Sequence, residues 1–460
     1  MEGMKRIVYT LLISLAFVVA QAQNVTITGR TNQADELIRL FVYEDLVNET
    51  GKQLAECQSD AQGLFLLKGK LSQPLNARIF VGLESVDMVL APNATYDIEV
   101  IVPEQQDNVS YFDKEMPTIR VRHATDKGIY RQVIISDDIT NGYLIDHISQ
   151  IYRGRQVRYI DSIQAAIQRA LPDITSDYVK NYNLYKQAAI RLAISTDGGK
   201  RVTTDYFDGK PVLYTNMAYI DLFKELFANQ FNKSVYDLHT LDDAFLTGPK
   251  AFMDYLNTDP FMARNPRLAE LITIYNLQGL CHGDPETRRY AKAHLEQMKA
   301  NTSFAEHRNI ITDFFASLNR LAPGTAAPDF SLKDSQGNNV KLSDYKNGLV
   351  LLQFVEGYSP VSERQMATLN ELHQQWNDSV QIVTIATRDK MDFYQQQFVE
   401  KGYDWPLLDL GNNILLLEAY NVKTFPEYIL IGRGNKIGSA PAPTPEKGLE
   451  ERVRGLYGKR

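Results

Sequence analysis

Cysteine is scarce in this chain: its 460 residues contain only two, Cys57 and Cys281. They stand far apart, so the chain has no Cys-x-x-Cys pair of the kind that binds zinc or exchanges disulfides. In an exported protein the two could form one bridge, or both could stay free. We expect two buried free thiols, because unpaired cysteine behaves as a small apolar side chain.

Basic clusters are also missing. Lys and Arg together number 49 against 56 Asp and Glu, which gives a net charge of −7. Removing residues 1–22 would take away Glu2, Lys5 and Arg6, one net positive charge, and leave about −8. Clustered Lys and Arg side chains strengthen binding to nucleic acids and anionic membranes. The composition therefore argues weakly against both as partners.

Long apolar runs are missing after the N-terminus. There, Lys5 and Arg6 precede the run Ile7–Ala20, and Ala20-Gln21-Ala22 supplies the small residues that a signal peptidase needs. The run is short for a membrane span, and a short N-terminal anchor is the alternative. We expect residues 1–22 to be a cleaved signal peptide, with no integral membrane span after cleavage. The expected location is the periplasm, with secretion or envelope association as alternatives.

The histidines form no recognisable metal motif. His294 and His307 are fairly close in sequence, but no His-Glu-x-x-His motif or compact carboxylate cluster accompanies them. A Gly-rich phosphate-binding loop is not visible either. We therefore expect no metal site and no cofactor.

Residues 24–104 have the pattern of short strands separated by turns, which predicts a small antiparallel β-sandwich. Ser59–Gly63 is a turn signal before a strand. The pattern resembles the β-sandwich domain that precedes thioredoxin-like domains in many exported proteins of Bacteroidetes-type bacteria. Five strands are expected, within Val25–Gly29, Leu37–Tyr43, Gly63–Leu67, Ala77–Val81 and Tyr96–Val100.

Residues 124–320 change to helical spacing, as in Ile163, Ala166, Ile167 and Ala170. Helix-breaking residues recur, and no fixed-period repeat is visible. This predicts an all-α middle region of many short helices. The region is dense in tyrosine, which we interpret as half-buried packing rather than a ligand cage; the residues are Tyr178, Tyr182, Tyr185, Tyr206, Tyr214 and Tyr219.

Residues 322–460 alternate strands with helices. Leu349–Val355 and Val380–Ala386 are continuous apolar runs, as in strands buried on both faces. Tyr428–Ile431 is a third such run. The alternation predicts an α/β domain with a central sheet.

Ordered motifs in this last region resemble the thioredoxin superfamily, in its TlpA/peroxiredoxin-like (AhpC/TSA-type) branch. Ala327-Pro-Asp-Phe and the strand Leu349–Phe354 look like the entry to that domain. Phe425-Pro-Glu-Tyr-Ile-Leu-Ile431 is similar to the family's proline loop and the strand after it. The resemblance implies a thioredoxin-like fold and a thiol-disulfide oxidoreductase activity.

The family's Cys-x-x-Cys pair opens the helix after the first buried strand, where the partial positive charge of the helix start stabilises a thiolate. In this sequence those positions hold Ser359-Pro360-Val361-Ser362. A serine hydroxyl cannot form a disulfide. Ser359 with Pro360 suits a helix cap, and a serine nucleophile would need a base. The only nearby histidine, His373, lies in the helix with no evident acidic partner. We expect no catalytic residue here.

The proline loop could keep a function that needs no sulfur. The resemblance implies a cis bond before Pro426 that turns the backbone of Phe425 outward beside the helix start. An extended peptide could pair with that backbone as an added strand. Tyr358, Phe425 and Pro426 are therefore candidate peptide-binding residues. The alternative is that Pro426 is only inherited architecture.

The sequence thus predicts a multidomain protein, with a β-sandwich at 24–104, helices at 124–320 and a thioredoxin-like domain at 322–460. Our leading hypothesis is non-catalytic binding of a protein or extended peptide in the cell envelope. One alternative is a TlpA-type thiol-disulfide oxidoreductase. Another is a structural scaffold that binds its partner through the helical region.

Overall fold

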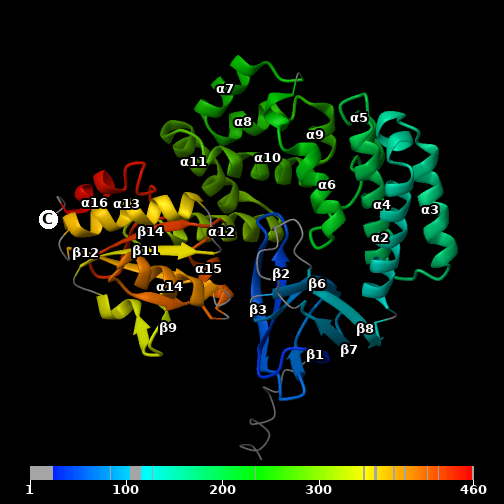
Figure 1. Ribbon diagram of the computed structural model, residues 1–460. Coiled ribbons are helices and arrows are strands. Elements are labelled where there is room, and N and C mark those ends of the chain that lie inside the picture. Colours follow the sequence, from blue (N-terminus) through cyan, green and yellow to red (C-terminus); the bar gives the residue numbers. More distant parts are fainter. Residues whose placement is uncertain are drawn as a thin grey trace, which may run out of the picture. The chain divides into compact units, whose positions relative to one another are not determined.

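The chain folds into two compact units, Met1–Thr312 and Asp313–Arg460 (Figure 1). The computed structural model describes residues 24–82, 84–103, 116–126, 128–233, 235–345, 348–356, 360–376, 379–387, 390–411, 413–422 and 424–457. The predicted signal peptide, residues 1–22, lies outside the described residues. Among the described residues, no helix combines the length and apolar character that a membrane crossing needs.

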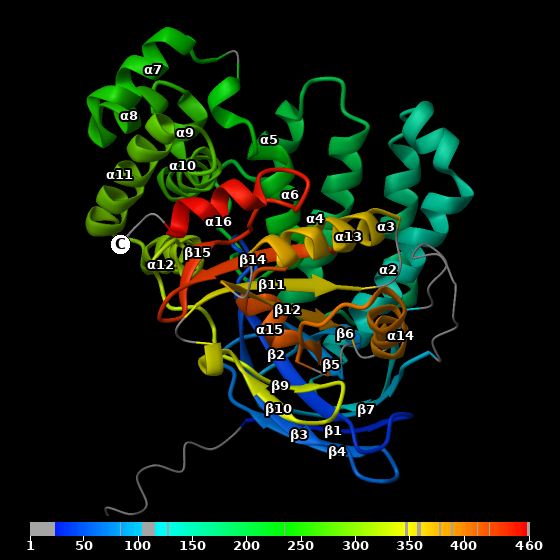
Figure 2. The ribbon, with the colours of Figure 1, turned by 60° about the vertical axis from the view of Figure 1, so that its left-hand side comes forward.

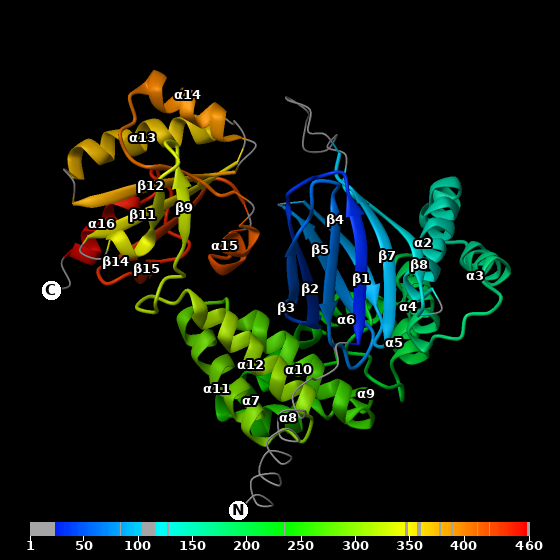
Figure 3. The same cartoon turned by 90° about the horizontal axis from the view of Figure 1, so that it is seen from below.

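The first unit begins with two four-stranded sheets, in the orders β4-β1-β7-β8 and β3-β2-β5-β6 (Figure 3). The pairs are antiparallel except β1 with β7, which run parallel. The strands are β1 (Val25–Thr31), β2 (Leu37–Asp45), β3 (Thr50–Gln58), β4 (Leu64–Gly69), β5 (Leu75–Val81), β6 (Glu84–Leu90), β7 (Ala94–Ile101) and β8 (Thr118–Ala124).

Three of these strands, β3, β6 and β8, were not among the five predicted from the sequence. All three are edge strands, with one hydrogen-bonded neighbour each. β3 and β8 have few buried side chains, so neither shows the alternation that marks a half-buried strand. Three of the predicted strands, β1, β4 and β7, do show it, whereas β2 and β5 are buried along most of their length.

The predicted turn at Ser59–Gly63 forms between β3 and β4. One carboxylate oxygen of Asp60 accepts hydrogen bonds from the backbone N–H groups of Gln62 and Leu64, at 2.9 and 2.8 Å. Gly63 has φ +74°, a left-handed conformation that favours glycine. A β-carbon at Gly63 would lie only 1.9 Å from the backbone oxygen of Thr31.

The rest of the first unit is helical, as predicted for the middle of the chain. Several helices begin with an aspartate or asparagine whose side chain accepts a backbone N–H, as at Asp284. The elements are α2 (Ile129–Asp146), η2 (Ser149–Arg153), α3 (Arg158–Ala170), α4 (Asp177–Ala193), α5 (Lys200–Tyr206), α6 (Met217–Phe227), η3 (Gln230–Asn232), α7 (Leu238–Thr247), α8 (Pro249–Leu256), α9 (Pro260–Arg264), α10 (Pro266–Leu280), α11 (Pro285–Asn301) and the first half of α12 (Ala305–Arg320), whose residues from Asp313 on belong to the second unit.

Helices and sandwich pack together within this unit. The Asn48 side chain donates to the backbone oxygen of Ile310 at 2.8 Å, and the Tyr178 hydroxyl donates to the Asn76 side chain at 3.1 Å. The hydroxyl of Tyr182 likewise donates to Asp137 at 2.8 Å. These bonds fit the interpretation of the tyrosines as packing. The boundaries predicted at residues 104, 124 and 322 stay predictions.

The second unit is built on a seven-stranded sheet in the order β10-β9-β13-β12-β11-β14-β15, with β11, β12 and β13 parallel. The elements are β9 (Ser331–Asp334), β10 (Asn339–Lys341), η4 (Leu342–Tyr345), β11 (Leu349–Val355), α13 (Pro360–Trp376), β12 (Val380–Ala386), α14 (Met391–Lys401), β13 (Leu407–Asp409), α15 (Ile414–Ala419), β14 (Glu427–Gly432), β15 (Lys436–Ser439) and α16 (Leu449–Tyr457).

Helices cover both faces of this sheet, which is why every residue of β11 is buried. Side chains of α13, α14 and α16 share one core cluster with Leu349 and Leu351. On the other face, Phe354 meets Tyr420, just after α15, with ring centroids 5.6 Å apart. Figure 2 shows α13 and α16 on one side of β11 and α15 on the other. The predicted thioredoxin-like α/β fold is confirmed.

Two glycine substitutions should separate the strain of the backbone from the steric clash. Gly63→Ala should lower the free energy of unfolding of the first unit by about 3 kcal/mol or more, because a left-handed alanine costs about 1–2 kcal/mol and its methyl group meets Thr31. Gly198 has φ +65° with no atom within 4 Å of a built β-carbon. Gly198→Ala should therefore cost only about 1–2 kcal/mol.

Denaturant unfolding followed by circular dichroism compares the two variants. Equal losses of stability would show that the turn between β3 and β4 yields enough to accept the methyl group.

Candidate functional site

The first part of the candidate site is the end of β11 and the start of α13. The strand ends at Val355, and Glu356 is exposed. Of the predicted positions, Tyr358 and Ser359 lie outside the described residues, as does the side chain of Pro360. Val361 is 44% exposed, whereas Ser362 is buried. The first turn of α13 thus presents an apolar side chain to solvent and turns its described serine inward.

The second part is the loop before β14. The peptide bond between Phe425 and Pro426 is cis, as the resemblance implies. Both residues are half-buried. The next residue, Glu427, pairs with Phe354 of β11. The proline loop therefore lies at the carboxyl end of β11, the same end from which the chain enters α13.

Two glutamates give this end of the sheet an acidic character. Glu356 is exposed, and Glu427 is half-buried with one carboxylate oxygen accepting from the Thr424 hydroxyl at 3.3 Å. Burial raises the pKa of Glu427, and the Thr424 hydrogen bond opposes the shift. Neither glutamate was singled out in the sequence, because isolated surface carboxylates carry no pattern.

Beneath this end lies a buried chain of hydrogen bonds that the sequence analysis did not identify; we call it the glutamine chain. The Trp405 indole donates to the Thr384 hydroxyl at 2.9 Å, which donates to Gln353 Oε1 at 2.8 Å. Gln353 Nε2 donates to the Tyr428 hydroxyl at 3.1 Å, and that hydroxyl donates to Gln365 Oε1 at 3.2 Å. The sequence did hold one sign of this chain, because Gln353 is the single polar residue of the otherwise apolar strand β11.

The glutamine chain joins β11, β12, β14 and α13 through neutral groups. Gln353 and Thr384 are fully buried, and burial raises the pKa of Tyr428, which keeps its hydroxyl protonated. Because a buried polar group without a partner is costly, we expect this chain to help hold α13 over the sheet, beside the apolar packing of that helix. It offers no carboxylate or imidazole that could relay protons.

The two cysteines lie in the first unit, not in the unit that contains the candidate site. Both are free; Cys57 is half-buried in β3 and Cys281 is buried just after α10. Burial raises the pKa of the Cys57 thiol, and it raises that of Cys281 to about 11. Thiols with raised pKa values are poor nucleophiles at neutral pH. The expected free thiols are present, although Cys57 is less buried than expected.

The interpretation of His373 needs one correction. Its Nε2 atom lies 3.0 Å from Asp404 Oδ1, so the histidine does have an acidic partner. Sequence distance hid the contact, because Asp404 follows α14. His373 nevertheless stands three turns beyond Ser362 in α13, a separation of about 16 Å at 1.5 Å per residue. It therefore cannot serve Ser362 as a base.

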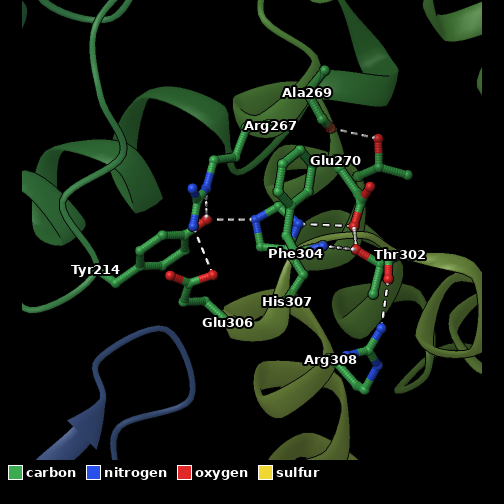
Figure 4. A network of polar contacts seen from close by, with 10 residues as sticks. Tyr214, Arg267, Ala269, Glu270, Thr302, Phe304, Glu306, His307 and Arg308 are labelled. Carbon is green, nitrogen blue, oxygen red and sulfur yellow. Dashed lines mark hydrogen bonds and ion pairs between the residues drawn. The ribbon is translucent and has the colours of Figure 1, made fainter.

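A second polar cluster lies in the helical region (Figure 4). His307, fully buried, bonds to Tyr214 through Nε2 at 2.7 Å and to Glu270 through Nδ1 at 2.8 Å. Arg267 donates to the Tyr214 hydroxyl at 2.9 Å and pairs with Glu306 at 2.6 Å. A carboxylate can only accept, so we assign the proton to Nδ1 and let the tyrosine donate to Nε2.

In this arrangement both ring nitrogens of His307 have a hydrogen-bond partner. Burial is the main cause that raises the pKa of Tyr214 to about 12, although Arg267 opposes the shift. A tyrosine that acts as a nucleophile or base needs a pKa lowered toward neutral pH. We therefore interpret the cluster as a cross-link between α10, α12 and the segment before α6. His294, by contrast, stacks on Phe245 with ring centroids 4.7 Å apart.

The comparisons with known proteins concern the second unit. A model of the AhpC/TSA family matches residues 323–439. The thiol-disulfide oxidoreductase ResA of Geobacillus kaustophilus is 31% identical over 130 residues, which are 28% of this chain and 74% of that protein. The chain belongs to the AhpC/TSA family. The ResA of Halalkalibacterium halodurans is 27% identical over 128 residues, 27% of this chain and 72% of that protein.

Solved structures are similar to about the same share of the chain. The thioredoxin domain of a thiol-disulfide oxidoreductase from Bacteroides vulgatus is 24% identical and covers 30% of this chain and 99% of its own, with a TM-score of 0.27. A thiol:disulfide interchange protein from Bacteroides sp. is 22% identical and covers 31% of this chain and 94% of its own, with a TM-score of 0.28.

Removal of one hydroxyl should test the role of the glutamine chain in this AhpC/TSA unit. Tyr428→Phe removes the hydroxyl that bonds Gln353 Nε2 and Gln365 Oε1, and we expect a loss of about 1–3 kcal/mol in the free energy of unfolding. Both tryptophans of the chain, Trp376 and Trp405, lie in this unit. Their fluorescence during denaturant unfolding therefore reports this unit selectively.

Tyr403→Phe is the matched control, because Tyr403 stacks on Trp405 with centroids 4.8 Å apart and its hydroxyl makes no hydrogen bond to the described residues. It should change stability by less than about 0.5 kcal/mol. If both variants lose equally little, the glutamine chain does not fix α13.

Proposed function

We propose that the AhpC/TSA unit binds extended segments of other proteins without exchanging electrons with them. One observation carries this proposal: residues 313–460 contain no cysteine. Disulfide exchange proceeds through attack of a thiolate on a sulfur atom, and a hydroxyl cannot replace it. Ser359 and Ser362 occupy the positions at which the family resemblance places the cysteine pair.

The binding half of the site does not need sulfur. The proline loop adjoins the end of β11, and no hydrogen bond of the Phe425 backbone to the described residues is seen. An unpaired backbone segment can accept an added strand from a partner. Half-buried Phe425 and exposed Val361 would supply apolar contacts beside it, with Tyr358 as a further candidate. The acidic Glu356 and Glu427 favour a segment with basic or neutral side chains.

We further propose that the protein acts in the cell envelope, where residues 1–22 would direct it. This part rests on the N-terminal charge and apolar pattern of the sequence. The partner would then be an exported protein or peptide in an extended conformation.

The second candidate function is that of a thiol-disulfide oxidoreductase, because the relatives ResA carry that name. It would have to use Cys57 or Cys281, which lie in the first unit. Their raised pKa values do not favour thiolate chemistry.

A redox assay distinguishes the two candidates. The purified protein should not accelerate insulin reduction by dithiothreitol or the oxidation of a dithiol peptide, since no thiol stands at the start of α13. The variant Cys57→Ser/Cys281→Ser should behave like the unaltered protein. Turnover that survives this double substitution would overturn the proposal, and turnover lost with it would assign the chemistry to the first unit.

A binding assay tests the proline loop. A reduced, alkylated and unfolded protein serves as probe, because blocked thiols prevent mixed disulfides. Phe425→Ala combined with Val361→Asp should weaken binding about tenfold or more, since loss of an apolar anchor costs about 2 kcal/mol. Val399→Asp is the matched control: Val399 is 84% exposed on α14, and its replacement should leave binding unchanged.

Two results would contradict this assignment. Equal binding by the double variant and the control would remove the proline loop from the contact. Full binding by a chain that ends at residue 322 would favour the scaffold hypothesis, in which the helical region holds the partner.

A further inference from the structure

The connection between α2 and α3 exposes an unusual amount of apolar surface; we call residues 145–158 the hairpin tip. Ile145 is 75% exposed, Ile148 59%, Val157 43% and Tyr152 41%. Single exposed apolar side chains are common, but a group of four within one short connection is a feature of interaction sites. Figures 1 and 2 show α2 and α3 as outer helices of the helical region.

The same segment is locally basic. Arg153, Arg155 and Arg158 are all exposed, against the single carboxylate of Asp146. With His147 neutral, the hairpin tip carries a net charge of +2, in a chain whose net charge is −7. Charges interact over about 8–10 Å at physiological salt, so a partner at the hairpin tip meets the local charge rather than the total.

The hairpin tip is a defined structure rather than a frayed end. Ile151 in η2 is fully buried in a cluster with Ile160, which anchors the segment from inside. The Gly154 N–H donates to the Ser149 oxygen at 2.8 Å, and Arg155 has φ +50°, a left-handed conformation that closes the turn. With the backbone set in this way, the exposed side chains cannot all turn inward.

We propose that the hairpin tip binds the surface of an anionic lipid bilayer. Isoleucine, valine and tyrosine side chains enter the boundary between headgroups and acyl chains, while arginines contact lipid phosphates. A connection that exposes both apolar and basic side chains within residues 145–158 fits a fluid surface better than a folded partner, which would have to offer a matching site. The scarcity of basic clusters argued weakly against membranes; the local charge reverses that argument. The proposal does not depend on peptide binding by the AhpC/TSA unit.

Vesicle co-sedimentation of the purified full chain tests the proposal. Vesicles of phosphatidylglycerol and phosphatidylcholine in equal parts should bind the protein at 50 mM salt, and pure phosphatidylcholine vesicles should bind it at least tenfold more weakly. Arg153→Gln/Arg155→Gln/Arg158→Gln should weaken anionic binding about 100-fold, roughly fivefold for each arginine. Ile145→Ser/Ile148→Ser/Tyr152→Ser should weaken it at least tenfold.

The matched control is Leu64→Ser/Leu66→Ser, which replaces two side chains of β4 that are 52% and 48% exposed. This control should bind like the unaltered protein, and circular dichroism checks that each variant is folded. No binding to anionic vesicles at 50 mM salt, or equal loss in the control, would overturn the proposal. Binding to soluble polyglutamate but not to vesicles would also overturn it and would identify an acidic protein as the partner.

Discussion

The arrangement of the C-terminal site depends on the side chain of Gln353. A buried amide must have partners for both its oxygen and its nitrogen, and here Thr384 and Tyr428 supply them. Because Tyr428 also reaches Gln365 in α13, satisfying the amide places that helix over the sheet. The position of α13 relative to the proline loop depends on this requirement together with the apolar packing of α13 on the sheet.

The same constraint limits the chemistry. The start of a helix stabilises a negatively charged side chain. That effect requires a side chain that ionises, and the positions aligned with the family's cysteine pair hold Ser359 and Ser362. The buried groups below are an amide, a hydroxyl and a protonated phenol, none of which exchanges protons near neutral pH. The neutral hydrogen bonds of the glutamine chain would instead hold α13 against the sheet. Rigidity favours binding, since a preformed strand edge loses little entropy when a peptide pairs with it.

The sequence predicted those parts of the molecule in which local pattern and tertiary structure agree. The apolar runs of β11 and β12 and the proline before β14 were recognisable without coordinates. Edge strands β3 and β8 were missed because neither has a buried face, so neither alternates between apolar and polar residues. The glutamine chain was missed for another reason: Gln353, Thr384 and Trp405 are separated in sequence, and only the folded sheet makes them neighbours. Asp404 escaped notice beside His373 for the same reason.

The total net charge of the chain likewise failed to indicate the charge of the hairpin tip. A net charge averages over the whole surface, whereas a partner meets only the side chains within a Debye length. The hairpin tip is basic because a left-handed residue at Arg155 and the inward Ile151 set a turn from which three arginines project. The two proposed contacts differ accordingly in their physics. Binding at the proline loop would use backbone and apolar contacts beside two glutamates and should depend less on salt, whereas binding at the hairpin tip would use mainly charge and should weaken strongly as salt rises.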